Sequence, residues 1–104
     1  MKFIFLALAF LFFSAVTAQA DEVIVRQSHS SFDVSGVTLN AGDTIVFKNG
    51  DNYAHDIEIT SRGETDDRGL QRPDQDLKYT FDKKGIYEVR CSIHARMGMI
   101  VTVR

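Results

Sequence analysis

Near its end the chain reads GIYEVRCSIHARMGM over residues 85–99. The first half is rich in β-branched and aromatic residues, which is typical of a strand, and the second half leads into the apolar closing run 100–104. Tyr87 stands at the entry to this strand. A tyrosine there either bonds back to the backbone at a Greek-key corner or simply packs inward. Strands are therefore expected at 86–91 and 100–104, on either side of a short loop.

The chain upstream continues this pattern. Short apolar or alternating runs separated by turn residues predict further strands at 22–26, 32–39, 44–48, 56–60 and 77–81. The stretch 61–76 is polar, highly charged and contains the only proline, so it is expected to be a long surface loop. About seven short strands at this spacing predict an all-β domain, an antiparallel sandwich or barrel.

The loop after the penultimate strand contains three kinds of metal ligand. Cys91 is followed three residues later by His94, and then by Met97 and Met99. Thiolate and imidazole are strong ligands, and a thioether is a weak one. One Cys, two His and a distant axial Met form the trigonal type 1 (blue) copper site. His55, at the start of a predicted strand after a turn-rich loop, is the expected second histidine.

Other interpretations of these residues have less support. A Cys-x-x-His pair is half of a zinc site, but structural zinc sites need further paired Cys or His, and only His29 remains. His29 lies in a Ser-rich stretch that indicates a solvated residue. A catalytic Cys–His pair needs an accessible thiolate and a third orienting group, which is not evident. The methionines alone are compatible with plain core packing. Cys, His and Met in one loop, with a remote His, favour copper.

The start of the chain has the layout of a secretory signal peptide. Lys2 supplies a positive charge, residues 3–13 are an unbroken apolar run, and residues 18–20 form a small-x-small cleavage site. The apolar run is shorter than the ~20 residues that a membrane-spanning helix needs. We expect a signal peptide over 1–20 and one domain over 21–104, exported to the bacterial periplasm and not inserted in a membrane after cleavage.

Composition excludes some functions. The chain has 12 Lys+Arg and 14 Asp+Glu, mixed along its length without a basic stripe, so nucleic acid is not an expected partner. Small exported domains often depend on disulfides, but Cys91 is the only cysteine, so no internal disulfide can form. A bound metal would both stabilise a small domain and protect the thiolate from oxidation.

These motifs resemble those of the cupredoxins, in particular the plastocyanin and amicyanin branch. The stretch VFKNGDNYAHDI, residues 46–57, is similar to the plastocyanin segment that ends with the first copper-binding histidine, and residues 85–97 are similar to the second ligand segment. The resemblance extends over the chain after the leader, apart from 61–76. It implies a Greek-key antiparallel β-sandwich and one type 1 copper per chain, with His55, Cys91 and His94 as equatorial ligands.

The resemblance offers two axial ligands, Met97 and Met99. Plastocyanins and pseudoazurins place the methionine eight residues after the cysteine, which selects Met99. Amicyanin-like loops place it six residues after, which selects Met97. Met97 leaves seven residues to the end of the chain, with Val101 and Val103 in the inward register, whereas Met99 leaves five, which is short for a closing strand. Met97 is the predicted axial ligand.

Two departures from the family pattern concern the ligand loops. Asp56 stands where an asparagine commonly follows the first histidine. Its backbone N–H is still expected to bond the thiolate, while its carboxylate would disfavour the reduced, less positive site. Ile93 and Ala95 stand where relatives often have proline, so the second loop is expected to be less rigid.

The resemblance implies an electron carrier and not an enzyme, because a site closed by its own ligands offers no open coordination position. We expect a monomer that exchanges single electrons with redox proteins, such as a c-type cytochrome or a periplasmic oxidoreductase. Tyr53, Ala54, Ala95 and Met99 are expected to form an apolar ring around His94. A copper-binding module for storage, delivery or sensing would use the same ligands. A metal-free adhesion-type sandwich would leave the four ligands unexplained.

Overall fold

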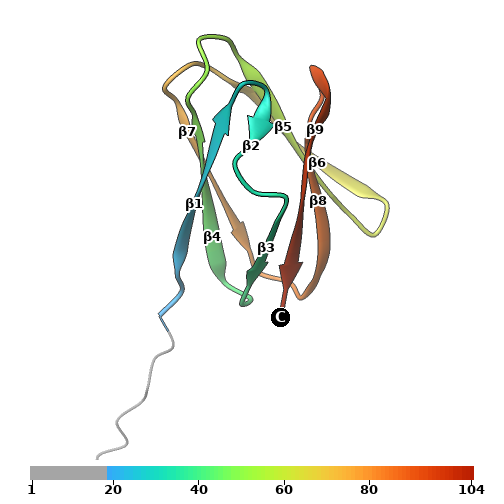
Figure 1. Cartoon of the computed structure of the whole chain (residues 1–104). Helices are drawn as coiled ribbons and strands as arrows, with labels where there is room; N and C mark the ends of the chain where they lie inside the picture. Colours follow the sequence, from blue (N-terminus) through green and yellow to red (C-terminus); the bar gives the residue numbers. More distant parts are fainter. Residues whose placement is uncertain (1–18) are drawn as a thin grey trace, which may run out of the picture.

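The computed structural model of the chain describes residues 19–104. The predicted signal peptide, residues 1–20, lies outside the described residues except for its last two, which are exposed. Nine strands make up the described part, which contains no helix and hence none that could span a membrane (Figure 1). The strands are β1 (Glu22–Ser28), β2 (Ser31–Phe32), β3 (Gly36–Leu39), β4 (Asp43–Asn49), β5 (His55–Ser61), β6 (Glu64–Gln71), β7 (Asp76–Phe81), β8 (Gly85–Cys91) and β9 (His94–Val103).

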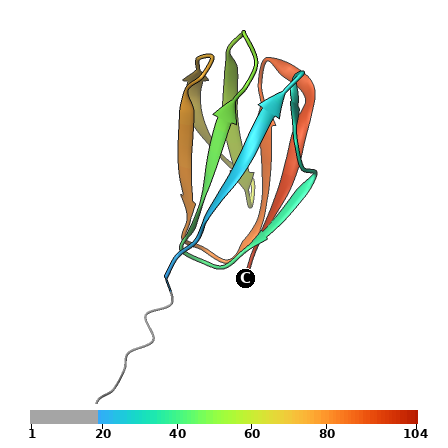
Figure 2. The same cartoon turned by 60° about the vertical axis from the view of Figure 1, so that its left-hand side comes forward.

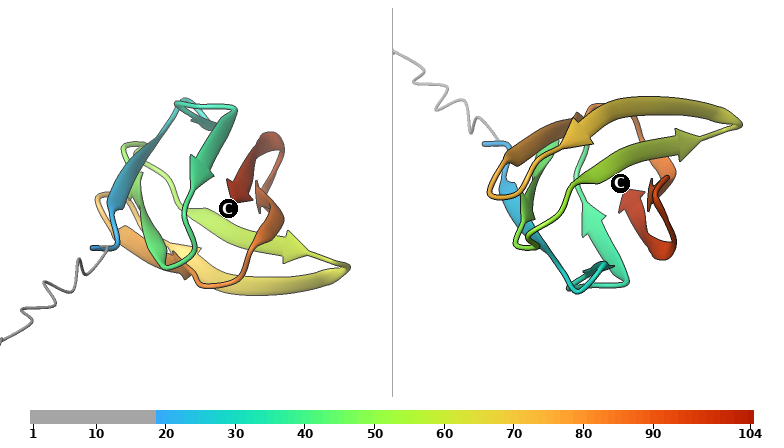
Figure 3. Two further views of the ribbon diagram at one scale, coloured as in Figure 1. Left: turned by 90° about the horizontal axis from the view of Figure 1, so that it is seen from below. Right: turned by 90° about the horizontal axis from the view of Figure 1, so that it is seen from above.

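The strands form two sheets that face each other (Figure 2). One sheet has the order β2-β1-β4-β7 and the other has the order β3-β9-β8-β5-β6. Seen end-on, the sheets enclose one interior, and the hairpin of β5 and β6 extends away from it on one side (Figure 3). The pairings of β1 with β4 and of β3 with β9 are parallel, and the others are antiparallel. The predicted all-β sandwich is confirmed, with mixed sheets in place of purely antiparallel ones.

The interior is formed by the inward side of each strand, as the period of two along a strand requires. In β9, for example, Met97, Met99, Val101 and Val103 are buried while the residues between them face outward. Full burial of one such apolar side chain stabilises the fold by about 1.5–3 kcal/mol. Together the strands enclose one apolar cluster, made of Val25, Phe32, Leu39, Ile45, Phe47, Ile57, Ile59, Phe81, Val89, Cys91, Met97, Met99, Val101 and Val103.

The expected long loop over 61–76 is wrong, because β6 occupies half of it. β6 pairs with β5 through the tight turn at Arg62 and Gly63, both of which have positive φ. A side-chain hydrogen bond of 2.8 Å joins Thr60 to Thr65 across the hairpin. Most residues of β6 are exposed, so the strand carries no inward apolar pattern from which it could be predicted. The strand count rises from about seven to nine, since 32–39 also divides into β2 and β3.

The tyrosine at the start of β8 forms a corner, one of the two arrangements that the sequence left open. The hydroxyl of Tyr87 donates a hydrogen bond of 2.6 Å to the backbone carbonyl of Lys83. Its ring packs edge-on against Phe81, with 5.0 Å between the ring centroids. This contact connects the turn between β7 and β8 to the core, and it settles the choice between corner and plain inward aromatic in favour of the corner.

Two connections meet at the end of the sandwich opposite the C-terminus. In Figure 1 the green β4–β5 connection and the red-orange β8–β9 connection both lie at the top, whereas the C-terminus lies at the bottom. The loop before β5 leads into His55, and the turn after β8 leads into His94. The fold therefore brings together two segments that are far apart in the sequence and that contain the predicted ligands.

Candidate metal centre

His55, Cys91 and His94 lie together at this end of the sandwich. One ligand atom from each side chain lies within 4.8 Å of those of the other two. The residues are the first of β5, the last of β8 and the first of β9, so three strand ends position them. His55 and Cys91 are buried, and His94 is partly buried. The three residues predicted as equatorial ligands therefore form one compact group of metal donors.

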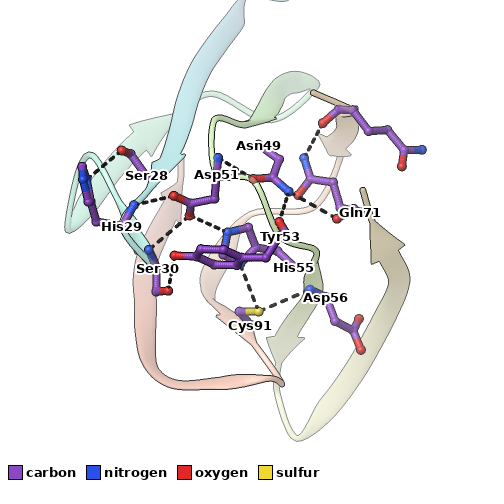
Figure 4. Close-up of polar contacts among 11 residues, drawn as sticks. Ser28, His29, Ser30, Asn49, Asp51, Tyr53, His55, Asp56, Gln71 and Cys91 are labelled. Carbon is purple, nitrogen blue, oxygen red and sulfur yellow. Dashed lines mark hydrogen bonds and ion pairs between the residues drawn. The ribbon is translucent and has the colours of Figure 1, made fainter. Parts of the chain in front are cut away.

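The loop before His55 is held by its own side chains (Figure 4). The Asn49 side-chain amide donates to the carbonyl of Tyr53 at 2.9 Å and to that of Gln71 at 3.3 Å, while its oxygen accepts the backbone N–H of Asp51 at 2.9 Å. Gly50 donates its N–H to the carbonyl of Gln27 at 2.8 Å. These bonds satisfy the backbone of a tight loop and fix where β5 begins.

The His55 imidazole has a different neighbour on each nitrogen. Nε2 lies 2.8 Å from Oδ2 of Asp51, and Nδ1 lies 3.6 Å from Sγ of Cys91. Burial alone would raise the pKa of the Asp51 carboxyl. The hydrogen bonds from His55 and from the backbone N–H groups of Ser30 and His29 outweigh burial, so its pKa is lowered below the usual value. Asp51 is thus an anion beside a buried histidine.

The sulfur of Cys91 is held by the backbone of the neighbouring strand. The N–H of Asp56 donates to Sγ at 3.2 Å, as the sequence predicted. Ser92 fixes the same junction from the other side. Its N–H donates to the carbonyl of Asp56 at 3.1 Å, and its hydroxyl donates to the Asp56 carboxylate at 2.8 Å. A hydrogen bond to a thiolate favours the charged form, which is the form that binds metal.

His94 completes the group from the solvent side. Its ring lies edge-on to those of His55 and Tyr53, with centroids 5.1 and 5.5 Å away. Its Nε2 is buried and has no hydrogen-bond partner in the part of the chain that the structure describes. A buried imidazole nitrogen without a partner is costly, and a metal would remove this cost. The donor set of one thiolate and two imidazoles fits Cu as well as Zn, but a soft thioether nearby favours Cu.

Met97 and Met99 lie at different positions along the β8–β9 ladder, although each side chain is only 2% exposed. Met99 pairs with Val89 inside the regular ladder of β8 and β9. The register then shifts beyond Gly98, so that Cys91 pairs with His94 and residues 95–97 bulge out of the ladder. Met97 therefore belongs to the layer of the ligand loop, and Met99 to the layer beneath it.

Two further sequence expectations have different outcomes. His29 is exposed, as predicted, and its Nδ1 lies 3.0 Å from the hydroxyl of Ser28. The expected apolar ring around His94 is wrong in one member, because Met99 is buried in the core while Tyr53 and Ala95 are exposed. The sequence assigned no role to Asp51, which lies in the turn-rich loop before His55. The available signal was an acidic side chain four residues before a ligand histidine.

A β-sandwich with a compact group of one cysteine and two histidines at its end is typical of one class of metalloprotein, and the comparisons identify the family. Residues 19–104 match the plastocyanin/azurin family of copper binding proteins. The chain is 33% identical over 104 residues to pseudoazurin of Methylorubrum extorquens, a match that covers 92% of this chain and 70% of that protein. It is 30% identical over 87 residues to amicyanin of Paracoccus versutus, covering 81% of this chain and 66% of that protein.

The fold is likewise shared. A solved structure of a methionine-to-alanine variant of amicyanin in the Cu(I) state superimposes with a TM-score of 0.74 at 17% identity, covering 80% of this chain and 82% of that one. This match supports the architecture alone. The chain belongs to the plastocyanin/azurin family of copper-binding proteins, the cupredoxins, and copper is its cofactor.

Proposed function

We propose that this chain is a periplasmic electron carrier that holds one type 1 copper with His55, Cys91, His94 and Met97. The observation that carries the proposal is the convergence of the two histidines and the cysteine within 4.8 Å at one end of a sandwich. When bound, copper supplies a one-electron couple between Cu(II) and Cu(I). The chain supplies a donor set closed by its own side chains, so no substrate position is provided and an enzymatic role is not proposed.

The rigidity of the donors supports transfer of single electrons. His55 and Cys91 are strand-end residues whose positions are fixed by the Asn49 loop and by the Asp56 N–H. Donors held in this way need to move little when the charge of the site changes, which favours fast electron exchange. A preset site also costs less reorganisation than a flexible one.

Met97 is the axial ligand in this proposal. The bulge at residues 95–97 supports this assignment, because the register shifts next to Cys91, whereas Met99 pairs with Val89 in the regular ladder. A thioether is a weak axial donor, so it needs only to lie near the trigonal plane of the three strong ligands.

A redox partner is proposed to approach at His94. Tyr53 is 38% exposed and Ile93 is 54% exposed, and Ala95 is also exposed, so the partly buried histidine is flanked by apolar side chains. Exposed apolar groups around a site favour close contact with another protein. We propose a c-type cytochrome or another periplasmic redox protein as the partner of a monomeric carrier.

Voltammetry of the copper-loaded protein tests the carrier function. We expect a reversible one-electron couple and, by stopped flow, rapid electron exchange with a c-type cytochrome. The alternative role, a copper-storage, delivery or sensing module, would give tight, colourless Cu(I) binding without a reversible couple. That result would contradict the carrier while leaving the family assignment intact.

A further inference from the structure

We infer that Asp51 is a positioning residue of the copper site, one that fixes the ring of His55 and adds a negative charge behind it. The inference rests on the proposed role of His55 as a ligand. Sequence and family comparison assign no role to this carboxylate. The contact is direct, since Oδ2 of Asp51 lies 2.8 Å from Nε2 of His55. The side chains are 8% and 0% exposed, respectively, so water does not compete strongly for either group.

The contact determines which nitrogen is free for metal. An ionised carboxylate only accepts hydrogen bonds, so Nε2 of His55 must be the ring nitrogen that carries the proton. The lone pair is then on Nδ1, which points to the donor group and lies 3.6 Å from Sγ of Cys91. A histidine ligand whose second nitrogen donates to a carboxylate has a fixed tautomer, a fixed ring orientation and a more basic ligand nitrogen.

The carboxylate is itself held from outside the ligand loop. Its Oδ1 accepts the N–H of His29 at 2.7 Å, and its Oδ2 accepts the N–H of Ser30 at 3.1 Å. These two residues form the turn between β1 and β2, and both have φ of 54°, in the left-handed region. The hydroxyls of Ser30 and Tyr53 lie 2.7 Å apart and tie the same turn to the loop before β5. Strands β1 and β2 thereby fix the orientation of a ligand on β5.

The negative charge of Asp51 is expected to change the reduction potential of the copper site in one direction. Among the ion pairs of residues 19–104, Asp51 contacts only the ring of His55. A negative charge in a buried setting favours the more positive oxidation state of the site. Asp51 is therefore expected to stabilise Cu(II) relative to Cu(I) and to lower the reduction potential.

The first test uses the copper-free wild-type protein and NMR of its histidine ring nitrogens. We expect His55 to be in the Nε2–H form, with a ring proton that exchanges slowly with water. A wild-type His55 in the Nδ1–H form would overturn the inference. This measurement needs neither a variant nor copper, so it remains decisive if a variant fails to fold or if the protein proves not to be a carrier.

The second test compares Asp51→Asn with Asp33→Asn. Asp33 is a control, because its carboxylate also accepts a backbone N–H, that of Arg26 at 3.1 Å, but forms no ion pair with a histidine within residues 19–104. Loss of an outer partner of a ligand typically changes metal affinity 10–100-fold. We expect Asp51→Asn to lower the Cu(II)/Cu(I) affinity ratio about tenfold, a rise of about 59 mV in potential, and to speed exchange of the His55 ring proton. Equal shifts in both variants, or none in Asp51→Asn, would contradict the inference.

Discussion

At the scale of single residues, the three strong donors differ in their access to solvent. His55 is 0% and Cys91 is 2% exposed, so both are enclosed by the sandwich. His94 is only partly buried and stands beside exposed Tyr53. In the proposed site, two donors would therefore keep water away from the metal, and the third would provide the edge through which an electron passes.

Substitution of each methionine tests the axial assignment. Met97→Leu should keep blue copper but raise the reduction potential, because it removes a weak donor to Cu(II). Met99→Leu should leave the potential almost unchanged, because Leu conserves the volume of a core residue. Voltammetry of both variants measures this, with about 59 mV for each tenfold change in the Cu(II)/Cu(I) affinity ratio. A large shift in Met99→Leu with none in Met97→Leu would reverse the assignment.

The sequence predicted the ligand chemistry better than its surroundings. Cys91 and His94 lie three residues apart, and no fold is needed to see that they share a loop. His55 could be predicted through its place after a turn-rich loop. The contact of Asp51 with His55 could not, since it depends on how the turn between β1 and β2 packs against this loop.

At the scale of elements, β6 differs most from expectation. A strand is predicted from an inward apolar face, but β6 has almost none, since it extends beyond the core and only Gln71 at its end is buried. By contrast, β4 and the end of β9 lie where strands were predicted, at 44–48 and 100–104, because both stretches are rich in β-branched residues. The bulge in β9 also escapes sequence analysis, because it arises from a shift of register between two strands.

The corner at the start of β8 gives a prediction about stability. Tyr87→Phe removes the hydroxyl that donates to Lys83 but keeps the ring that packs on Phe81. Loss of one such hydrogen bond costs about 1 kcal/mol. For a domain of this size, that corresponds to a fall of about 4–8 °C in melting temperature.

Calorimetry of the copper-free protein measures this fall, and the blue absorption of the copper form serves as the control. The absorption should not change, because Tyr87 contacts Lys83 and Phe81 near the start of β8, whereas Cys91 is the last residue of this strand. An unchanged melting temperature would show that the hydroxyl does not stabilise the corner.

At the scale of the whole molecule, the start of the domain is connected to its core. The backbone nitrogen of Asp21 donates to Oδ1 of Asp43 at 2.9 Å, and Asp43 is 5% exposed. Cleavage after Ala20 would turn this nitrogen into a charged ammonium beside a carboxylate. The resulting charge-assisted bond is stronger than the neutral one.

We therefore predict that the exported protein begins at Asp21. Mass spectrometry of the periplasmic fraction should give the mass of residues 21–104, and an intact chain beginning at Met1 in the membrane fraction would contradict the prediction. Asp43→Asn should lower the melting temperature of the cleaved form more than that of the uncleaved form, because only the cleaved form has the new ammonium.

Copper should also stabilise the whole domain. A ligand that binds only the folded state adds about 2.7 kcal/mol at a free concentration of 100 times its Kd. The chain has no second cysteine with which to form a disulfide, so the metal is the available cross-link between β5, β8 and β9. Calorimetry with and without Cu(II) should show a higher melting temperature with copper, reversed by a chelator. Equal melting temperatures would indicate that copper is not bound at the proposed site.

The visible absorption spectrum of the purified protein with one equivalent of Cu(II) tests the central claim most directly. Thiolate-to-copper charge transfer should give an intense blue band in the wild type. Cys91→Ala should abolish this band while circular dichroism still reports a folded β-sandwich. His29→Asn should leave the band unchanged, because His29 is exposed and asparagine tolerates the left-handed backbone at this position. A wild type without the blue band, or a Cys91→Ala variant that keeps it, would contradict the type 1 copper site.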